Sequence, residues 1–122
     1  MRAVVIHEFG PTEELRVEEI PHPIPGFGEV LIDVQATAAN FVDLLVISGK
    51  YQFLPERPFI PGKLPTGIVS ALGPGVHDWA VGDRVLTLAE HGGYAEKAIV
   101  PAKDCYRLPD RMSFEDGAAM AR

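Results

Sequence analysis

The sequence has 122 residues, a net charge of −6 and a hydrophobic fraction of 47%. That length is typical of one domain, and ordinary hydrophobic and charged fractions exclude a wholly disordered or fibrous chain. Twelve glycines and 11 prolines interrupt helices and favour turns, which disfavours a helical bundle. We therefore predict one folded domain over residues 1–122.

The charge balance and the cysteine content indicate which partners and which cellular compartment to expect. An acidic balance repels phosphate backbones and no Lys/Arg cluster offsets it, so we predict no nucleic-acid partner. Cys105 is the single cysteine, which leaves no internal disulfide and favours the reducing cytoplasm. The sequence contains neither a run of about 18 apolar residues nor a signal-peptide core, so we predict no membrane insertion or export.

Strand signals dominate the first third of the chain. We predict strands over 2–7 and 14–19, separated by a Gly-Pro turn, and an extended connection over 21–28, PHPIPGFG. The clearest strand is 29–38, where apolar residues alternate with a mostly polar set at a period of two. This pattern indicates that one face of the sheet covers the core.

The periodicity becomes helical after residue 40 and predicts a short helix over 41–48. Asn40 and Asp43 resemble a helix N-cap and its acidic partner, and Gly49 stands where a left-handed C-cap is needed. The prolines of KYQFLPERPFIPG (50–62) prevent further helix, so we predict a long loop there.

Strand signals then recur about every 8–12 residues, a spacing typical of all-β folds. We predict strands over 67–73, 82–89 and 93–100, with a tight turn at 73–76. Together with the Gly-rich turns, this spacing predicts a small β-barrel or sandwich that carries one or two helices.

The pattern of the C-terminal segment predicts a helix that reaches the last residue of the sequence. Ser113 and Asp116 form a capping box, and the run GAAMA begins a helix that stops at Arg122. A helix of about nine residues is marginal without a partner. We therefore expect another domain to begin just beyond it.

Most of the candidate functional groups have a structural explanation. The two Gly-x-Gly segments, at 26–28 and 73–75, do not follow a strand and open a helix, so we interpret them as turns rather than dinucleotide-binding loops. The histidines lack the spacing of metal ligands and are assigned to surface or capping roles. They are His7, His22, His77 and His91.

Two side chains have both a structural and a functional interpretation, and a third has only a structural one. Asn40 either caps the helix or turns its amide into a cleft as donor and acceptor. Tyr51 either covers apolar surface beside Phe53 or donates a proton to a developing oxyanion or enolate. Cys105 follows Asp104 and lacks a cationic neighbour in the sequence, so we predict an inert thiol.

Four segments together closely resemble the medium-chain dehydrogenase/reductase superfamily and, within it, the zinc-free quinone oxidoreductases related to zeta-crystallin. These segments keep the order and spacing of the family's blocks over essentially the whole chain. They are NFVDLLVISGKYQFLPERPFIPG (40–62), GIVSALGPGVHDWAVGDRV (67–85), GGYAEKAIVP (92–101) and LPDRMSFEDGAAM (108–120). The resemblance implies a mainly β fold with short helices, the GroES-like partly open β-barrel that forms the family's catalytic domain.

The resemblance also implies a site and an activity. Asn40 and Phe41 match positions that border the nicotinamide of NADPH, and Tyr51 matches a position that lines the substrate pocket. In zinc-dependent relatives a Cys stands at the position of Asn40 and a Cys-rich lobe holds a second zinc, so the lone Cys105 implies that both metals are absent. The implied reaction is hydride transfer from NADPH to a small quinone or enone.

One departure from the family pattern lies in the block Pro61–Gly67. Relatives usually carry an acidic residue where this chain has Leu64, which neither accepts a hydrogen bond nor holds a charge. The resemblance further implies a Rossmann domain after the helix near Ser113, which would hold most of the NADPH. Because that domain would hold the cofactor, we predict that the 122 residues alone are inactive. Since homodimers are common in the family, the resemblance also implies that the full-length protein can form a homodimer, with contacts largely in the Rossmann domain.

Two alternatives stay open. An enoyl-thioester reductase belongs to a sister branch with the same domain plan, in which a Tyr can deliver a proton. A stand-alone binding or chaperone-like module would use the GroES-like barrel without a cofactor, although the helix that is cut short argues against it.

Overall fold

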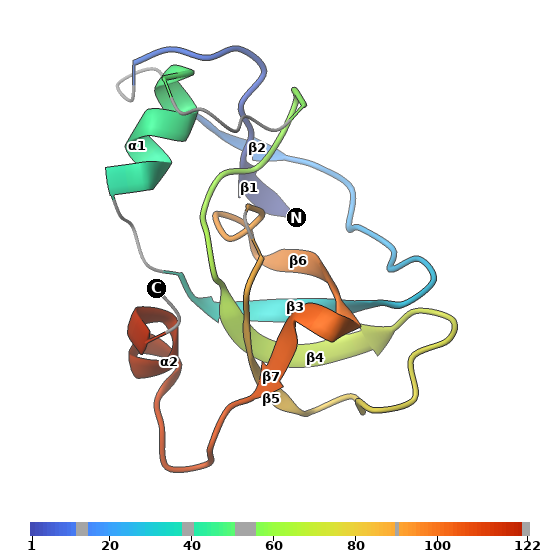
Figure 1. Cartoon of the computed structure of the whole chain (residues 1–122). Helices are drawn as coiled ribbons and strands as arrows, with labels where there is room; N and C mark the ends of the chain where they lie inside the picture. Colours follow the sequence, from blue (N-terminus) through green and yellow to red (C-terminus); the bar gives the residue numbers. More distant parts are fainter. Residues whose placement is uncertain (12–14, 38–40, 51–55, 90, 121–122) are drawn as a thin grey trace.

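The computed structural model describes residues 1–11, 15–37, 41–50, 56–89 and 91–120. Within these residues, seven strands, two α-helices and one 3-10 helix (η2) follow one another (Figure 1). They are β1 (Arg2–Val4), β2 (Val17–Glu19), β3 (Glu29–Ala36), α1 (Phe41–Ser48), β4 (Thr66–Leu72), β5 (Arg84–Thr87), β6 (Lys97–Pro101), η2 (Ala102–Asp104), β7 (Cys105–Arg107) and α2 (Phe114–Met120).

The strands form two antiparallel sheets. Five strands pair in the order β6-β3-β4-β5-β7, while β1 and β2 form a two-stranded sheet. An Ala3–Ala95 bridge and a hydrogen bond from the Val4 N–H to the Tyr94 carbonyl (2.9 Å) connect the small sheet to the segment before β6. The two sheets do not close into one ring within the described residues. This arrangement confirms the prediction of a mainly β, partly open barrel with short helices.

The main core lies on one face of the five-stranded sheet. Its most buried side chains are fully inaccessible to solvent and come from four of the strands: Val30, Ile32, Val69, Val85 and Val100. The predicted alternation on β3 is confirmed for Val30 and Ile32. Leu31, on the opposite face, is also buried (8% exposed), so the second face of β3 is covered at that end.

A second, smaller core fixes α1 against the N-terminal strands. Val46 and Ile47 of α1 pack with Ile6 and Phe59 in this cluster. The predicted helix 41–48 is confirmed, and it ends at Gly49 with a left-handed φ of +81°. A Cβ at Gly49 would lie 2.9 Å from the Cβ of Phe9, so glycine satisfies both the helix end and the packing. The proposed cap at Asn40 lies outside the described residues.

Other boundaries differ from the sequence prediction for identifiable reasons. The strand predicted from residue 93 begins at Lys97, because the backbone before it bonds to another segment: the Gly93 and Tyr94 N–H groups donate to the carbonyls of Gly62 and Pro61. The sequence analysis missed β7, a three-residue strand paired with β5. At the C-terminus α2 is confirmed as a helix, and the Asp116 N–H donates to Ser113 Oγ (3.1 Å) as the capping box predicts.

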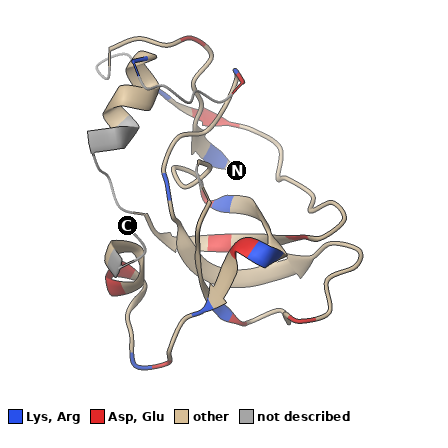
Figure 2. Ribbon diagram, in the orientation of Figure 1, with Lys and Arg blue, Asp and Glu red and all other residues tan. Residues whose placement is uncertain are grey.

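Charged residues are spread over the described surface. Figure 2 shows Lys and Arg on separate strands and loops, interspersed with Asp and Glu rather than gathered in one place. In the described part of the chain, no helix has the length and apolar character that a membrane span requires.

Candidate functional site

Three distant segments meet where β3 ends, just before the residues that the resemblance assigns to the cofactor. Ala36 pairs with Thr66 of β4. The Thr37 Oγ1 hydroxyl donates to the Gly93 carbonyl (3.1 Å), and the Gly93 N–H donates to the Gly62 carbonyl (2.9 Å). We call residues 36–37, 61–66 and 93 the β3 exit. These hydrogen bonds fix the direction in which the chain leaves the sheet.

Glycine is required twice at the β3 exit because the backbones approach one another closely. Gly62 has a φ of +100°, and a Cβ there would lie 2.6 Å from the ring of Tyr94 and 2.8 Å from its backbone nitrogen. A Cβ at Gly93 would lie 2.6 Å from Thr37 Oγ1. A side chain at either position would therefore push these segments apart.

Leu64 adopts a backbone conformation that is unusual for its residue type. Its φ is +58°, and a left-handed conformation costs an L-residue about 1–2 kcal/mol. Two hydrogen bonds to neighbouring residues fix this conformation. The Leu64 N–H donates to the Ala89 carbonyl (2.8 Å), and Thr87 Oγ1 donates to the Pro65 carbonyl (2.8 Å). The position that carries an acid in the related block thus holds an apolar side chain on a constrained backbone.

Thr66 connects the β3 exit to α2. Its side chain is fully buried, and its hydroxyl donates to the Phe114 carbonyl (2.9 Å) at the start of the helix. Gly117 allows the helix to approach, since a Cβ there would lie 2.7 Å from Leu108 Cδ1. The guanidinium of Arg84 lies 4.6 Å from the centre of the Phe114 ring and adds a cation–π contact. The C-terminal helix is therefore held against the same edge of the barrel.

The three residues predicted to act in the site are not all described. Asn40 and Tyr51 lie outside the described residues, and Phe41 is the first residue of α1 with its side chain outside the description. The structure describes the chain on both sides of Asn40, from Thr37 and from the start of α1. The roles of Asn40, Phe41 and Tyr51 stay predictions.

The remaining candidates from the sequence have the structural roles assigned to them. Gly28 and Gly75 lie in turns with φ values of +75° and +82°. All four histidines are exposed. Cys105 is buried, and its thiol donates to the Pro101 carbonyl (3.6 Å). Burial, followed by the nearby Asp104 carboxylate, raises the pKa of Cys105 to about 11, which agrees with an unreactive thiol.

Sequence reasoning missed the residues that position this site. Thr37 and Gly93 were predicted only as members of strands, and Thr66 was given no role, because their partners are 30 to 56 residues away. The one available signal was the Gly92-Gly93 pair, which marks a close approach of backbone without saying to what.

The family of the chain follows from comparison with known proteins. Residues 26–110 match the alcohol dehydrogenase GroES-like domain. Because the match covers most of the chain, the protein belongs to this family, and the predicted GroES-like fold is confirmed.

Individual relatives place the chain more closely. It is 40% identical over 119 residues to the mouse synaptic vesicle membrane protein VAT-1 homolog-like, and 40% identical over 122 residues to the quinone oxidoreductase of Lama guanicoe. These alignments cover 98% of this chain but 28% and 37% of the relatives, respectively. The chain therefore spans about a third of their length.

Solved structures agree with this placement. The human synaptic vesicle membrane protein VAT-1 homolog-like superposes with a TM-score of 0.91 at 40% identity, covering 98% of this chain and 38% of that one. Escherichia coli quinone oxidoreductase, solved in complex with NADPH, superposes with a TM-score of 0.89 at 32% identity, covering 98% and 36%. The predicted resemblance to the quinone oxidoreductase branch is confirmed.

Proposed function

We propose that this chain is the N-terminal catalytic domain of an NADPH-dependent quinone oxidoreductase that works without zinc. The observation that carries the proposal is the likeness to quinone oxidoreductases along essentially the whole chain, at up to 40% identity. Bound NADPH would supply a hydride to a quinone or enone. A quinone that takes up this hydride and one proton becomes a hydroquinone, and NADP⁺ is released.

In this proposal the β3 exit positions the reacting groups. Asn40 and Phe41 border the nicotinamide, at the point where the chain passes from β3 into α1. Tyr51 contacts the acceptor and stabilises negative charge on its oxygen through its hydroxyl. The hydrogen bonds of Thr37 to Gly93 and of Thr66 to Ala36 support the proposal because they restrain the end of β3, where that passage begins.

The cofactor's phosphates would be held outside this chain. Both Gly-x-Gly segments are turns between extended segments, and neither presents helix N–H groups to a phosphate. We therefore propose that a C-terminal Rossmann domain completes the site. The 122 residues alone should not oxidise NADPH, and measurable NADPH oxidation by them would contradict this part of the proposal.

The zinc-free character rests on the ligand set. Cys105 is the only cysteine, and its thiol is buried with a raised pKa, which opposes thiolate coordination. Turnover by the intact protein should survive dialysis against a chelator. Loss of activity in the chelator that added Zn²⁺ restores would contradict the proposal.

Steady-state kinetics of the intact protein test the reaction. We expect NADPH-dependent reduction of 9,10-phenanthrenequinone to be faster than that of a 2-enoyl thioester such as crotonyl-CoA. Preferred reduction of the thioester would favour an enoyl-thioester reductase instead. Absence of NADPH oxidation with either acceptor would favour a binding module.

A conservative variant tests the role of Tyr51. Tyr51→Phe should lower kcat by at least about tenfold with little change in stability, because only the hydroxyl is removed. Tyr106→Phe is the matched control, since Tyr106 lies half exposed on the edge strand β7, and β5 separates it from Thr66 of the β3 exit. Unchanged kinetics in Tyr51→Phe would remove Tyr51 from the mechanism.

A further inference from the structure

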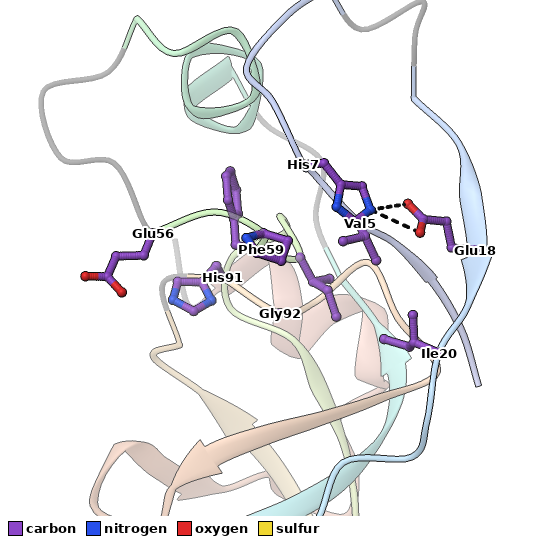
Figure 3. A pocket seen from close by; sticks show the side chains of 10 residues that line it. Val5, His7, Glu18, Ile20, Glu56, Phe59, His91 and Gly92 are labelled. Carbon is purple, nitrogen blue, oxygen red and sulfur yellow. Dashed lines mark hydrogen bonds and ion pairs between the residues drawn. The ribbon is translucent and has the colours of Figure 1, made fainter.

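A cavity of about 630 Å³ lies beside the small sheet, lined in part by Phe59, which also packs in the cluster with α1 (Figure 3). Ile6 packs in the cluster with α1, whereas its neighbours Val5 and His7 line the cavity, as alternation along an extended chain requires. We call it the β1–β2 pocket. Its described lining residues are Val5, His7, Glu18, Ile20, Glu56, Pro58, Phe59, Ile60, His91 and Gly92.

Backbone hydrogen bonds hold the walls of the β1–β2 pocket together. The Ile6 N–H donates to the Phe59 carbonyl (2.7 Å), and the Phe59 N–H donates back to the Ile6 carbonyl (3.1 Å). The Gly92 N–H donates to the Ile60 carbonyl (2.7 Å). Four stretches of chain that are distant in sequence thus form one preformed hollow. Its volume is within the range of about 300–1,000 Å³ typical of small-molecule sites.

The lining combines an apolar interior with polar groups at two sides. Val5, Ile20 and Ile60 contribute aliphatic surface. In Figure 3 the Glu18 carboxylate lies beside His7 on one side of this surface, while His91 and Glu56 lie on the other. Glu18 Oε1 and Oε2 lie 3.1 and 2.9 Å from His7 Nε2.

The charge of the β1–β2 pocket is negative. Its ten described lining residues include two carboxylates and neither Lys nor Arg. The guanidinium of Arg57, although adjacent in sequence, lies 4.7 Å from the centre of the Phe9 ring, and Phe9 packs against the cluster with α1. The Glu18 side chain is 35% exposed. A carboxylate accepts several hydrogen bonds, so Glu18 retains capacity for a donor besides His7.

We propose that the β1–β2 pocket binds a small amphiphilic amine, with its apolar body on Val5, Ile20 and Ile60 and its ammonium group at Glu18. Aliphatic surface favours the apolar body, and a carboxylate that can accept a further hydrogen bond favours a cationic head over a neutral or anionic one. The pocket shares none of its lining residues with the β3 exit. The amine would therefore be held by none of the residues assigned to the proposed oxidoreductase site, although Ile60 and Gly92 adjoin the β3 exit in sequence.

Three probes of equal shape and different charge test the proposal: 3-phenylpropylamine, 3-phenylpropanol and 3-phenylpropionate. Each is titrated into the intact protein labelled at Ile and Val methyl groups, and the methyl signals of Val5, Ile20 and Ile60 are followed by NMR. We expect saturable shifts with the amine, about tenfold weaker binding of the alcohol and weaker binding still of the acid. Absence of saturable shifts at these methyls, or binding of the acid as tight as that of the amine, would overturn the proposal.

A pair of variants assigns the charge preference to one residue. Glu18→Gln should reduce the preference for amine over alcohol to about twofold or less. Glu19→Gln, which makes the same change at the next residue of β2, should keep the tenfold preference, because Glu19 is 76% exposed and outside the lining. Equal effects of the two variants would overturn the proposal. If Glu18→Gln fails to fold, the ranking of the three probes in the unaltered protein decides alone.

Discussion

Replacing Gly67 with Ala tests a close approach of two backbones within the five-stranded sheet. Gly67 lies on β4 opposite Val34 of β3. A Cβ at this position would lie 2.0 Å from the Asp33 carbonyl oxygen, 2.9 Å from its carbon and 3.0 Å from Ile32 Cγ2. The nearest atoms belong to backbone in the centre of the sheet, so they cannot turn aside as the end of a flexible side chain can.

The expected loss of free energy of unfolding follows from the distance by which β3 and β4 must separate. Real Cβ atoms essentially never lie within 3.0 Å of such atoms, so β3 and β4 must move apart by about 1 Å. This displacement weakens about two backbone hydrogen bonds, each with a net value of about 1 kcal/mol, and adds about 1–3 kcal/mol of overpacking. We expect Gly67→Ala to lower the free energy of unfolding by about 3–5 kcal/mol. A chain of this length has about 6–18 kcal/mol in total.

Urea unfolding followed by the fluorescence of Trp79, the single tryptophan, measures the change. Gly26→Ala is the matched control, because the atom nearest its Cβ is Glu29 Oε1, the end of a flexible side chain (2.9 Å). We expect the control to change the free energy of unfolding by less than about 1 kcal/mol. Equal effects of the two substitutions would refute the argument from close approach.

Four further predictions concern three single side chains. Because burial raises the pKa of Cys105 to about 11 from an ordinary 9.0, its alkylation at pH 8 should be at least about 100-fold slower than that of a free cysteine, and equal rates would contradict the burial. Between pH 9 and 11 the Cys105 thiol ionises in the unfolded chain but stays protonated in the folded one, so the free energy of unfolding should fall over this range. Cys105→Ala should reduce this fall, as measured by urea unfolding at each pH. Thr66→Val should lower the free energy of unfolding by about 1–3 kcal/mol, because the Phe114 carbonyl loses its donor, and a change below about 0.3 kcal/mol would show that this bond is dispensable. Lys97→Met should cost less than about 1 kcal/mol, since its ion pair with Asp33 is partly exposed, and a cost that is larger in 1 M salt than in dilute buffer would contradict a screened pair.

Local sequence pattern was sufficient for most of the elements. The period-two alternation at 29–38 predicted β3, and the change to helical spacing at 41–48 predicted α1. These predictions succeeded because periodicity, caps and glycine turns act within a few residues of one another. The strand β7 was missed because three residues carry too little pattern, and among the described strands it pairs with β5 alone.

The candidate site was less accessible to sequence reasoning. The resemblance supplied Asn40, Phe41 and Tyr51, whose roles stay predictions. The hydrogen bonds that form the β3 exit join residues as far apart as Thr37 and Gly93, and nothing near either residue in the chain indicates its partner. The β1–β2 pocket was missed for the same reason, since its lining comes from four separate stretches.

The sequence by itself determined the class of fold, the placement of the turns and the family, because these depend on residue types and short-range spacing. Only the tertiary structure decided which strands pair, which glycines are required by close contact and where a hollow opens on the surface. The physical reason is that burial and hydrogen bonding between distant segments depend on the order β6-β3-β4-β5-β7. That order brings Asp33 against Gly67, while the separate pairing of β1 with β2 leaves Val5 and Glu18 beside a cavity.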